Sequence, residues 1–268
     1  MNFTTKVDIR NNPWTLHVED KLLTLGSCFS DNIAEKMREY FLRVTSNPFG
    51  TLYNPISIAH HMNSKEVQDA DVILVTFGTS WVYMLDGEVV DNCQKRPASL
   101  FIRRRLTVNE IVGQWRSILE KNPQKRFIFT VSPIRHVKDG LHENHISKAI
   151  LLQAIDEIIH GTPTRAVYFP SYEILMDELR DYRFYAEDML HPSKTAIDYL
   201  WERFRIMFYY TQITAGKLHE LHQLWLDNNH RPLHPDTEEA RAFKKHLEQE
   251  FRQLHLQYEW IELTEENK

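Results

Sequence analysis

The sequence has few of the residues that build covalent cross-links or phosphate-binding loops. It contains two cysteines, Cys28 and Cys93, in 268 residues, which excludes a disulfide framework and fits a reducing compartment. It has eight glycines and neither a G-x-x-x-x-G-K-S/T nor a G-x-G-x-x-G motif. We therefore expect no nucleotide cofactor, and no other cofactor is indicated.

A long hydrophobic run is also missing. No stretch approaches the roughly 18 to 20 uncharged apolar residues that span a bilayer. The N-terminal residues carry charge and lack the apolar segment of a secretory signal. We expect a cytoplasmic protein with no membrane partner.

Charge and histidine content exclude two further classes of protein. The net charge of −5 argues against nucleic acid as a partner, and the short basic run 103–105 is typical of a solvated face. Fourteen histidines include the pairs His142/His145 and His219/His222, but neither pair has an evident third ligand. We expect no metal site.

Four apolar runs, rich in β-branched and aromatic residues, predict buried strands. Each is continuous rather than alternating, as is typical of a parallel strand covered on both faces. Helix-like segments separate them, and one opens with the capping box Thr107-x-x-Glu110. This alternation predicts a doubly wound α/β sheet. The runs cover residues 21–26, 71–78, 125–133 and 165–171, with a short fifth candidate at 42–45.

The pattern changes near residue 193, where the chain becomes helical and aromatic. We expect helices at 197–210, 213–226 and 237–258, with a proline-bearing break at 230–236. This divides the chain into an α/β domain, residues 1–205, and a helical C-terminal extension, residues 206–268. The extension packs on the core or mediates self-association into a homo-oligomer.

Polar residues that follow the predicted strands are the candidates for chemistry, because ligands bind at the carboxyl ends of parallel strands. Ser27 follows Gly26 at the end of the first run, at the start of a helix. It can act as a nucleophile near the positive helix end, or merely cap the helix. Asp188 and His191 form a D-x-x-H turn after the last run, a spacing that lets a carboxylate orient an imidazole base.

The chain resembles the GSCFA-domain family, which is grouped with the SGNH (GDSL-like) hydrolases. The resemblance runs from about residue 22 to 203 and is carried by the strings GSCFS, NPFGTLYNP, FGTSWVY, DNCQK and SPIRH. It implies a flavodoxin-like three-layer α/β/α fold of the SGNH type. The helical extension carries no family motif.

The resemblance also implies roles for single residues. Ser27 matches the nucleophile of these hydrolases, and Asp188 and His191 match the remainder of a catalytic triad. Gly50 matches a glycine whose backbone N–H joins the oxyanion hole. Ser80 stands where the oxyanion-hole asparagine is expected, so either Ser80 or Asn92 is the candidate second donor; losing such a donor can cost roughly 3 kcal/mol.

Other residues near the strand ends allow more than one interpretation. Cys28 is expected to be a small packed thiol rather than the nucleophile. Arg135 and His136 follow the third run on the predicted site rim, with Ser132 just before them. His136 can bind substrate, act as an alternative base or play a structural part. Candidate pocket-lining residues are Thr79 and Trp81, and Trp81 can equally be core.

Two functions from different classes follow. The first is a serine-dependent hydrolase or acyltransferase acting on O-acyl esters of small molecules or carbohydrates, O-acetyl esters among them. The second is a non-catalytic protein that binds a carbohydrate or another partner on the same fold, because a fold does not fix a function.

Overall fold

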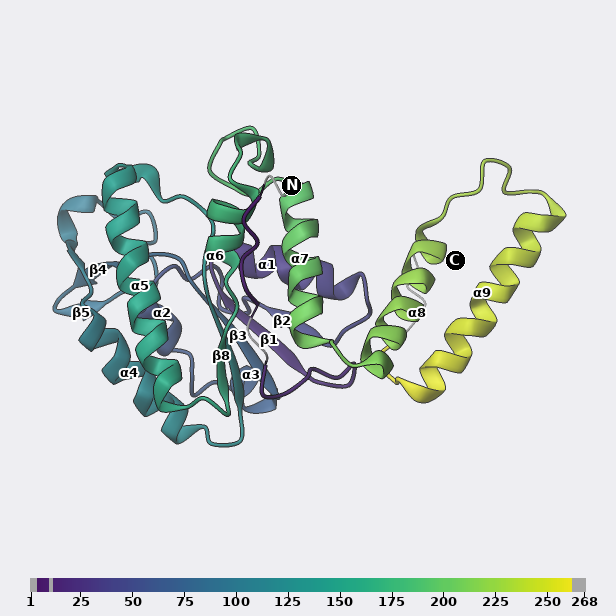
Figure 1. The fold of residues 1–268 in the computed structure, drawn as a ribbon, viewed down its shortest axis with the longest axis horizontal. Helices are drawn as coiled ribbons and strands as arrows, with labels where there is room; N and C mark the ends of the chain where they lie inside the picture. The colour runs from purple at the N-terminus through teal and green to yellow at the C-terminus, as the bar shows by residue number, and fades with distance from the viewer. Residues whose placement is uncertain (1–3, 10–11, 262–268) are drawn as a thin grey trace.

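The molecule is built on a parallel sheet of five strands. The computed structural model describes residues 4–9 and 12–261 (Figure 1). The strand order is β2-β1-β3-β7-β8, and every neighbouring pair is parallel. The predicted strands and the short fifth candidate are thereby confirmed. Their bounds are β1 Leu22–Gly26, β2 Val44–Ser46, β3 Val72–Phe77, β7 Arg126–Val131 and β8 Ala166–Tyr168.

Helices cover both faces of this sheet, which explains why its central strands β1 and β3 are buried along their whole length. Alternate residues of one strand enter two separate cores, as Leu22 and Leu23 of β1 do. One core is closed by α1 (Cys28–Arg38) and α7 (Lys194–Phe208), and the other by α4 (Val108–Lys121) and α5 (Leu141–Gly161). The three-layer α/β/α prediction is confirmed.

The helix ends follow from local sequence. The predicted capping box of α4 is present, with Thr107 and Glu110 bonded reciprocally. Asn54 caps the short helix α2 (Pro55–Ala59), and Ser64 caps α3 (Lys65–Asp69). The short helix α6 spans Ser171–Glu173.

A small antiparallel sheet between β3 and α4 was not predicted from the sequence. It has the order β5-β4-β6, with β4 at Trp81–Leu85, β5 at Glu88–Val89 and β6 at Ile102–Arg105. Its strands are short and partly exposed, so they lack the apolar runs that indicated the main sheet. The basic run lies on β6, where Arg104 and Arg105 form ion pairs with Glu110 and Glu143.

Two C-terminal helices, α8 (Gln212–Asn229) and α9 (Glu238–Gln257), project from the α/β body as a hairpin (Figure 1). The predicted boundary at residue 205 falls inside α7. Phe41 packs edge-on against Phe251 of α9, and the Trp260 indole donates to the carbonyl of Phe41 at 2.9 Å. The hairpin thus shares one core with the body; self-association stays a prediction.

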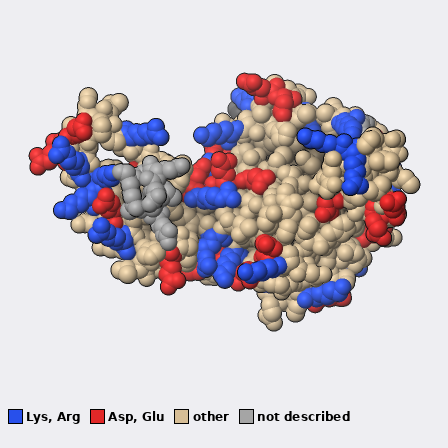
Figure 2. Space-filling view, turned by 180° about the vertical axis from the view of Figure 1, so that it is seen from behind, with Lys and Arg blue, Asp and Glu red and all other residues tan. Residues whose placement is uncertain are grey.

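Charges of both signs lie on one face of the molecule. Lys and Arg side chains lie among Asp and Glu side chains on the face shown in Figure 2. No helix within the described ranges is long and apolar enough to cross a membrane.

Candidate active site

Ser27 lies at the junction of β1 and α1. It is the N-cap of α1, where its Oγ accepts a hydrogen bond from the Phe29 amide at 3.3 Å. Ser27 therefore caps helix α1 in this structure, which is the second of the two roles expected for it from the sequence. Gly26, which precedes it, has φ +138°, and a Cβ added there would lie 2.2 Å from the Thr76 carbonyl oxygen of β3. The glycine is required by the close approach of two strands, and it leaves Ser27 at the carboxyl end of the sheet.

The Ser27 hydroxyl faces a second serine. Its Oγ donates to the Oγ of Ser132 at 3.0 Å, and Ser132 follows β7 directly. Ser132 Oγ also accepts from the Ile134 amide at 3.3 Å. Both serines are fully buried. An ester can therefore reach Ser27 only when neighbouring side chains move.

Asp188 and His191 form the expected pair. Nδ1 of His191 lies 2.5 Å from Oδ2 of Asp188, on a turn in which Met189 adopts φ +59°. The pKa of Asp188 is lowered to about 2, mainly by the His191 and Leu190 amides that donate to Oδ1 and further by the imidazole. The carboxylate therefore stays ionised, and Nε2 of His191 is the ring nitrogen that does not face Asp188.

One segment, 132–135, connects the two halves of the site. Ser132 contacts Ser27, while the Arg135 amide donates to the carbonyl of Leu190 at 3.2 Å, next to His191. Among the described residues no direct hydrogen bond joins Ser27 to His191. The structure thus forms the Asp–His pair and tethers it to the segment beside the serine, without closing the triad.

Comparison with known protein families identifies the family of this chain. The sequence pattern of the GSCFA family matches residues 21–66 and 61–204, more than half of the chain. The chain belongs to the GSCFA family. No curated protein matches it.

Solved structures similar to this GSCFA protein include an esterase and a lipase of low sequence identity. A catalytic mutant of Axe2, an acetylxylan esterase from Geobacillus stearothermophilus, is 13% identical with a TM-score of 0.50, covering 74% of this chain and 99% of its own. A GDSL-like lipase from Bacteroides thetaiotaomicron is 11% identical with a TM-score of 0.47, covering 70% and 87%. The likeness to the acetylxylan esterase shows that this chain has an SGNH-type fold.

Ser80 stands at the position of the expected oxyanion-hole asparagine, and its side chain faces Ser147 of α5. Its hydroxyl donates to Oγ of Ser147 at 3.0 Å, and its amide donates to the same atom at 2.7 Å. The hydroxyl of Thr79 also lies 3.1 Å from Ser147 Oγ. Ser80 is fully buried, and both its hydroxyl and its amide donate to Ser147 of α5.

The Gly50 amide and the Asn92 side-chain oxygen form hydrogen bonds within their own loops. The Gly50 amide donates to the Asn47 carbonyl at 2.8 Å, inside a turn where Gly50 has φ +80°. Oδ1 of Asn92 accepts from the Gln94 amide at 2.9 Å. Within the described part of the chain, no hydrogen bond joins either residue to Ser27, and an oxyanion role for either stays a prediction.

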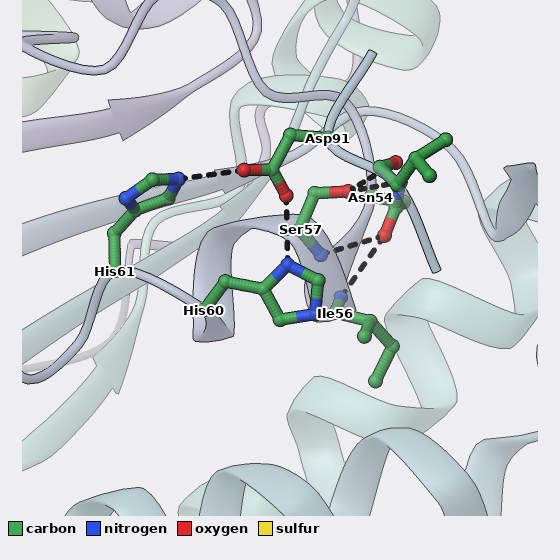
Figure 3. A network of polar contacts seen from close by, with 7 residues as sticks. Asn54, Ile56, Ser57, His60, His61 and Asp91 are labelled. Atoms are coloured by element: carbon green, nitrogen blue, oxygen red, sulfur yellow. Dashed lines mark hydrogen bonds and ion pairs between the residues drawn. The ribbon is translucent and has the colours of Figure 1, made fainter. Parts of the chain in front are cut away.

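Asp91, the first residue of the DNCQK string, has a structural part that the sequence did not indicate. Its two carboxylate oxygens each lie 2.8 Å from a histidine nitrogen, one of His60 and one of His61 (Figure 3). Ser57 of α2 donates to the carbonyl of Val90 in the same network. These contacts fasten the loop after β5 to helix α2.

Arg135 borders a hollow beside the D-x-x-H turn. Its guanidinium lies 4.1 Å from the ring centre of Tyr185 and 5.0 Å from that of Tyr182. The hollow holds about 380 Å³. Its position is compatible with the predicted substrate-binding role of Arg135, which remains a prediction. Besides these three residues its lining includes His145, Tyr172, Leu175, Met176, Asp177, Arg180 and Asp181.

His136 and Trp81 are packed against other side chains. The His136 ring meets Tyr53 edge-on at 5.7 Å, and its amide donates to Oδ1 of Asn144 at 2.9 Å. Trp81 lies on β4 under the guanidinium of Arg103, at 4.2 Å. A role for either in binding substrate stays a prediction.

Cys28, next to the candidate nucleophile, packs against the core formed with α1 and α7. Burial raises the pKa of its thiol, which keeps the thiol protonated at neutral pH. A reactive cysteine needs the opposite shift. The environment therefore agrees with a packed thiol.

A buried lysine beneath the site was not singled out from the sequence. Lys148 of α5 is 1% exposed, and its Nζ donates to the carbonyl oxygens of Gly78 at 2.6 Å and Ser132 at 2.7 Å. Burial lowers its pKa to about 7. Lys148 thus ties together the backbone that follows β3 and β7.

Within the described residues, no three His, Cys, Asp or Glu side chains are grouped so as to hold a metal ion.

Proposed function

We propose that this GSCFA protein is a serine-dependent hydrolase or acyltransferase acting on O-acyl esters. The observation that supports this most is the Asp188–His191 pair, held at 2.5 Å and tethered to the segment beside Ser27. The SGNH-type fold places these residues at the carboxyl end of the sheet, where such folds bind ligands. Because an acetylxylan esterase shares the fold, O-acetylated carbohydrates are the first substrates to test.

In the proposed first step, Ser27 Oγ attacks the acyl carbon and its proton passes to Nε2 of His191. A new bond forms between Oγ and carbon, and the carbonyl π electrons move onto the oxygen as an oxyanion. Asp188 holds the opposite nitrogen, Nδ1, and stabilises the imidazolium. The positive end of α1 lies where this negative charge develops.

In the second step, the oxyanion collapses and the bond to the leaving alcohol breaks. His191 returns the proton to that alcohol, leaving an acyl group on Ser27. Water or an acceptor hydroxyl then attacks the acyl-enzyme by the reverse sequence. Because Ser27 is buried, an acceptor bound beside it would keep water away from the acyl-enzyme. Acyl transfer is therefore proposed alongside hydrolysis.

A non-catalytic binding protein is the second candidate. It is favoured by one observation: the Ser27 hydroxyl caps α1 and donates to Ser132, while the His191 imidazole, within the described ranges, is hydrogen-bonded to Asp188 and not to Ser27. In that case the tyrosine-lined hollow beside Arg135 would take a ligand that is never cleaved.

Labelling with a fluorophosphonate probe tests the proposal. We expect the wild-type protein and Cys28→Ala to become labelled, and Ser27→Ala to remain unlabelled, because only an activated serine attacks the probe. Circular dichroism verifies that each variant is folded. Labelling of none of the three, in folded protein, would support the binding alternative instead.

A further inference from the structure

We propose that the hydroxyl of Ser132 donates a hydrogen bond to the oxyanion and so replaces the asparagine that this sequence lacks. The inference rests on the proposed function, since it assigns a further catalytic residue to the same reaction. Ser132 would hold the negative oxygen formed when Ser27 attacks the ester. Its own bonds neither form nor break.

The geometry supports this role. Oγ of Ser132 lies 3.0 Å from Oγ of Ser27, which becomes one of the oxygens of the tetrahedral intermediate. The oxyanion and the attacking oxygen share one carbon atom, so a donor beside the latter reaches the former when the ester binds with its carbonyl oxygen turned toward Ser132. Both side chains are fully buried, and a hydrogen bond to a charge is strengthened where water is excluded.

The proton of Ser132 is available for donation. The two hydrogen bonds of its hydroxyl, from Ser27 Oγ and from the Ile134 amide, are both accepted by the oxygen. Among the described residues, none accepts a hydrogen bond from this hydroxyl. When Ser27 gives its proton to His191, Ser132 loses one incoming donor and can turn its own proton toward the new negative oxygen.

The position of Ser132 is fixed in advance, as electrostatic stabilisation requires. Its carbonyl oxygen accepts from the Lys148 ammonium at 2.7 Å, and Lys148 binds the Gly78 carbonyl as well. The Ile134 amide orients the hydroxyl itself. Little rearrangement is then needed when charge develops.

The alternative donor is less well placed. The Ser80 hydroxyl is committed to Ser147, which also receives the Ser80 amide. Freeing it would leave buried polar groups without hydrogen-bond partners, which is unfavourable. Ser132 needs no such rearrangement.

Steady-state kinetics of Ser132→Ala with p-nitrophenyl acetate tests the inference. We expect kcat to fall by roughly 10²-fold, the usual loss for one oxyanion donor, with KM within about threefold of wild type. Ser132→Thr keeps the hydroxyl and should restore most of kcat. Ser171→Ala is the matched control: it removes another fully buried hydroxyl, bonded to the Val131 carbonyl at 2.8 Å, and should leave kcat unchanged.

The outcomes are distinguishable. A kcat for Ser132→Ala within about threefold of wild type, or a loss that Ser171→Ala reproduces, would overturn the oxyanion role alone, provided that turnover still requires Ser27. An effect confined to KM, or one that Ser132→Thr fails to rescue while its melting temperature is native, would also overturn it. Turnover that is absent or independent of Ser27 would overturn both the inference and the proposed function.

Discussion

Replacing His191 by glutamine should lower kcat for an activated acetyl ester by roughly 10⁴-fold, because glutamine cannot take the proton of Ser27. The Asp188 carboxylate already holds Nδ1 of His191 at 2.5 Å, which makes this imidazole the expected base. Initial rates at saturating ester, for folded wild-type and variant protein, measure the loss. KM should change much less than kcat.

His60→Gln is the matched control for this variant. It also breaks a short Asp–His contact, the 2.8 Å pair with Asp91, but in the cluster that fastens α2 to the loop after β5. We expect its kcat to stay within about threefold of wild type. Equal losses in His60→Gln and His191→Gln would mean that the D-x-x-H pair has no special part in turnover.

Replacing Gly26 by alanine should destabilise the protein by more than about 4 kcal/mol or prevent folding, because two large penalties coincide. The added Cβ would lie 2.2 Å from a backbone oxygen of β3, and φ is +138°, a region that only glycine adopts freely. Urea denaturation followed by circular dichroism gives the free energy of unfolding.

Gly113→Ala provides the contrast. Gly113 lies inside α4, and apart from the adjoining residues and the nearby helix backbone no atom lies within 4 Å of a Cβ added there. Alanine is the better helix former, so we expect this variant to be up to about 1 kcal/mol more stable than wild type. A Gly26→Ala protein with the stability of Gly113→Ala would show that β1 and β3 are not as close as described.

The layered fold was predictable because its signals are local. Strands buried on both faces are almost continuously apolar, as in β3. Helix α4 begins with a capping box that can be recognised in the sequence. The small sheet was not predictable in the same way, because β5 has only the two residues Glu88–Val89 and its strands are partly exposed.

The candidate site was predictable where its residues adjoin in sequence, and not elsewhere. Asp188 and His191 are three positions apart, and Ser27 follows a strand end. The contact of Ser27 with Ser132 spans 105 positions and depends on the pairing of β1, β3 and β7. Lys148 lies in a helix, where a charged residue normally faces water, so its burial under two strand ends has no local signal.

The central claim is that Ser27 carries an acyl group during turnover. The most direct test is to trap this intermediate. The protein is mixed with excess p-nitrophenyl acetate and quenched with acid within the first turnovers, and its peptides are then fragmented by mass spectrometry. We expect one acetyl group on Ser27 and none on Cys28 or Ser30. Ester turnover without any acetyl-Ser27, or an acetyl group on Cys28 instead, would contradict the account.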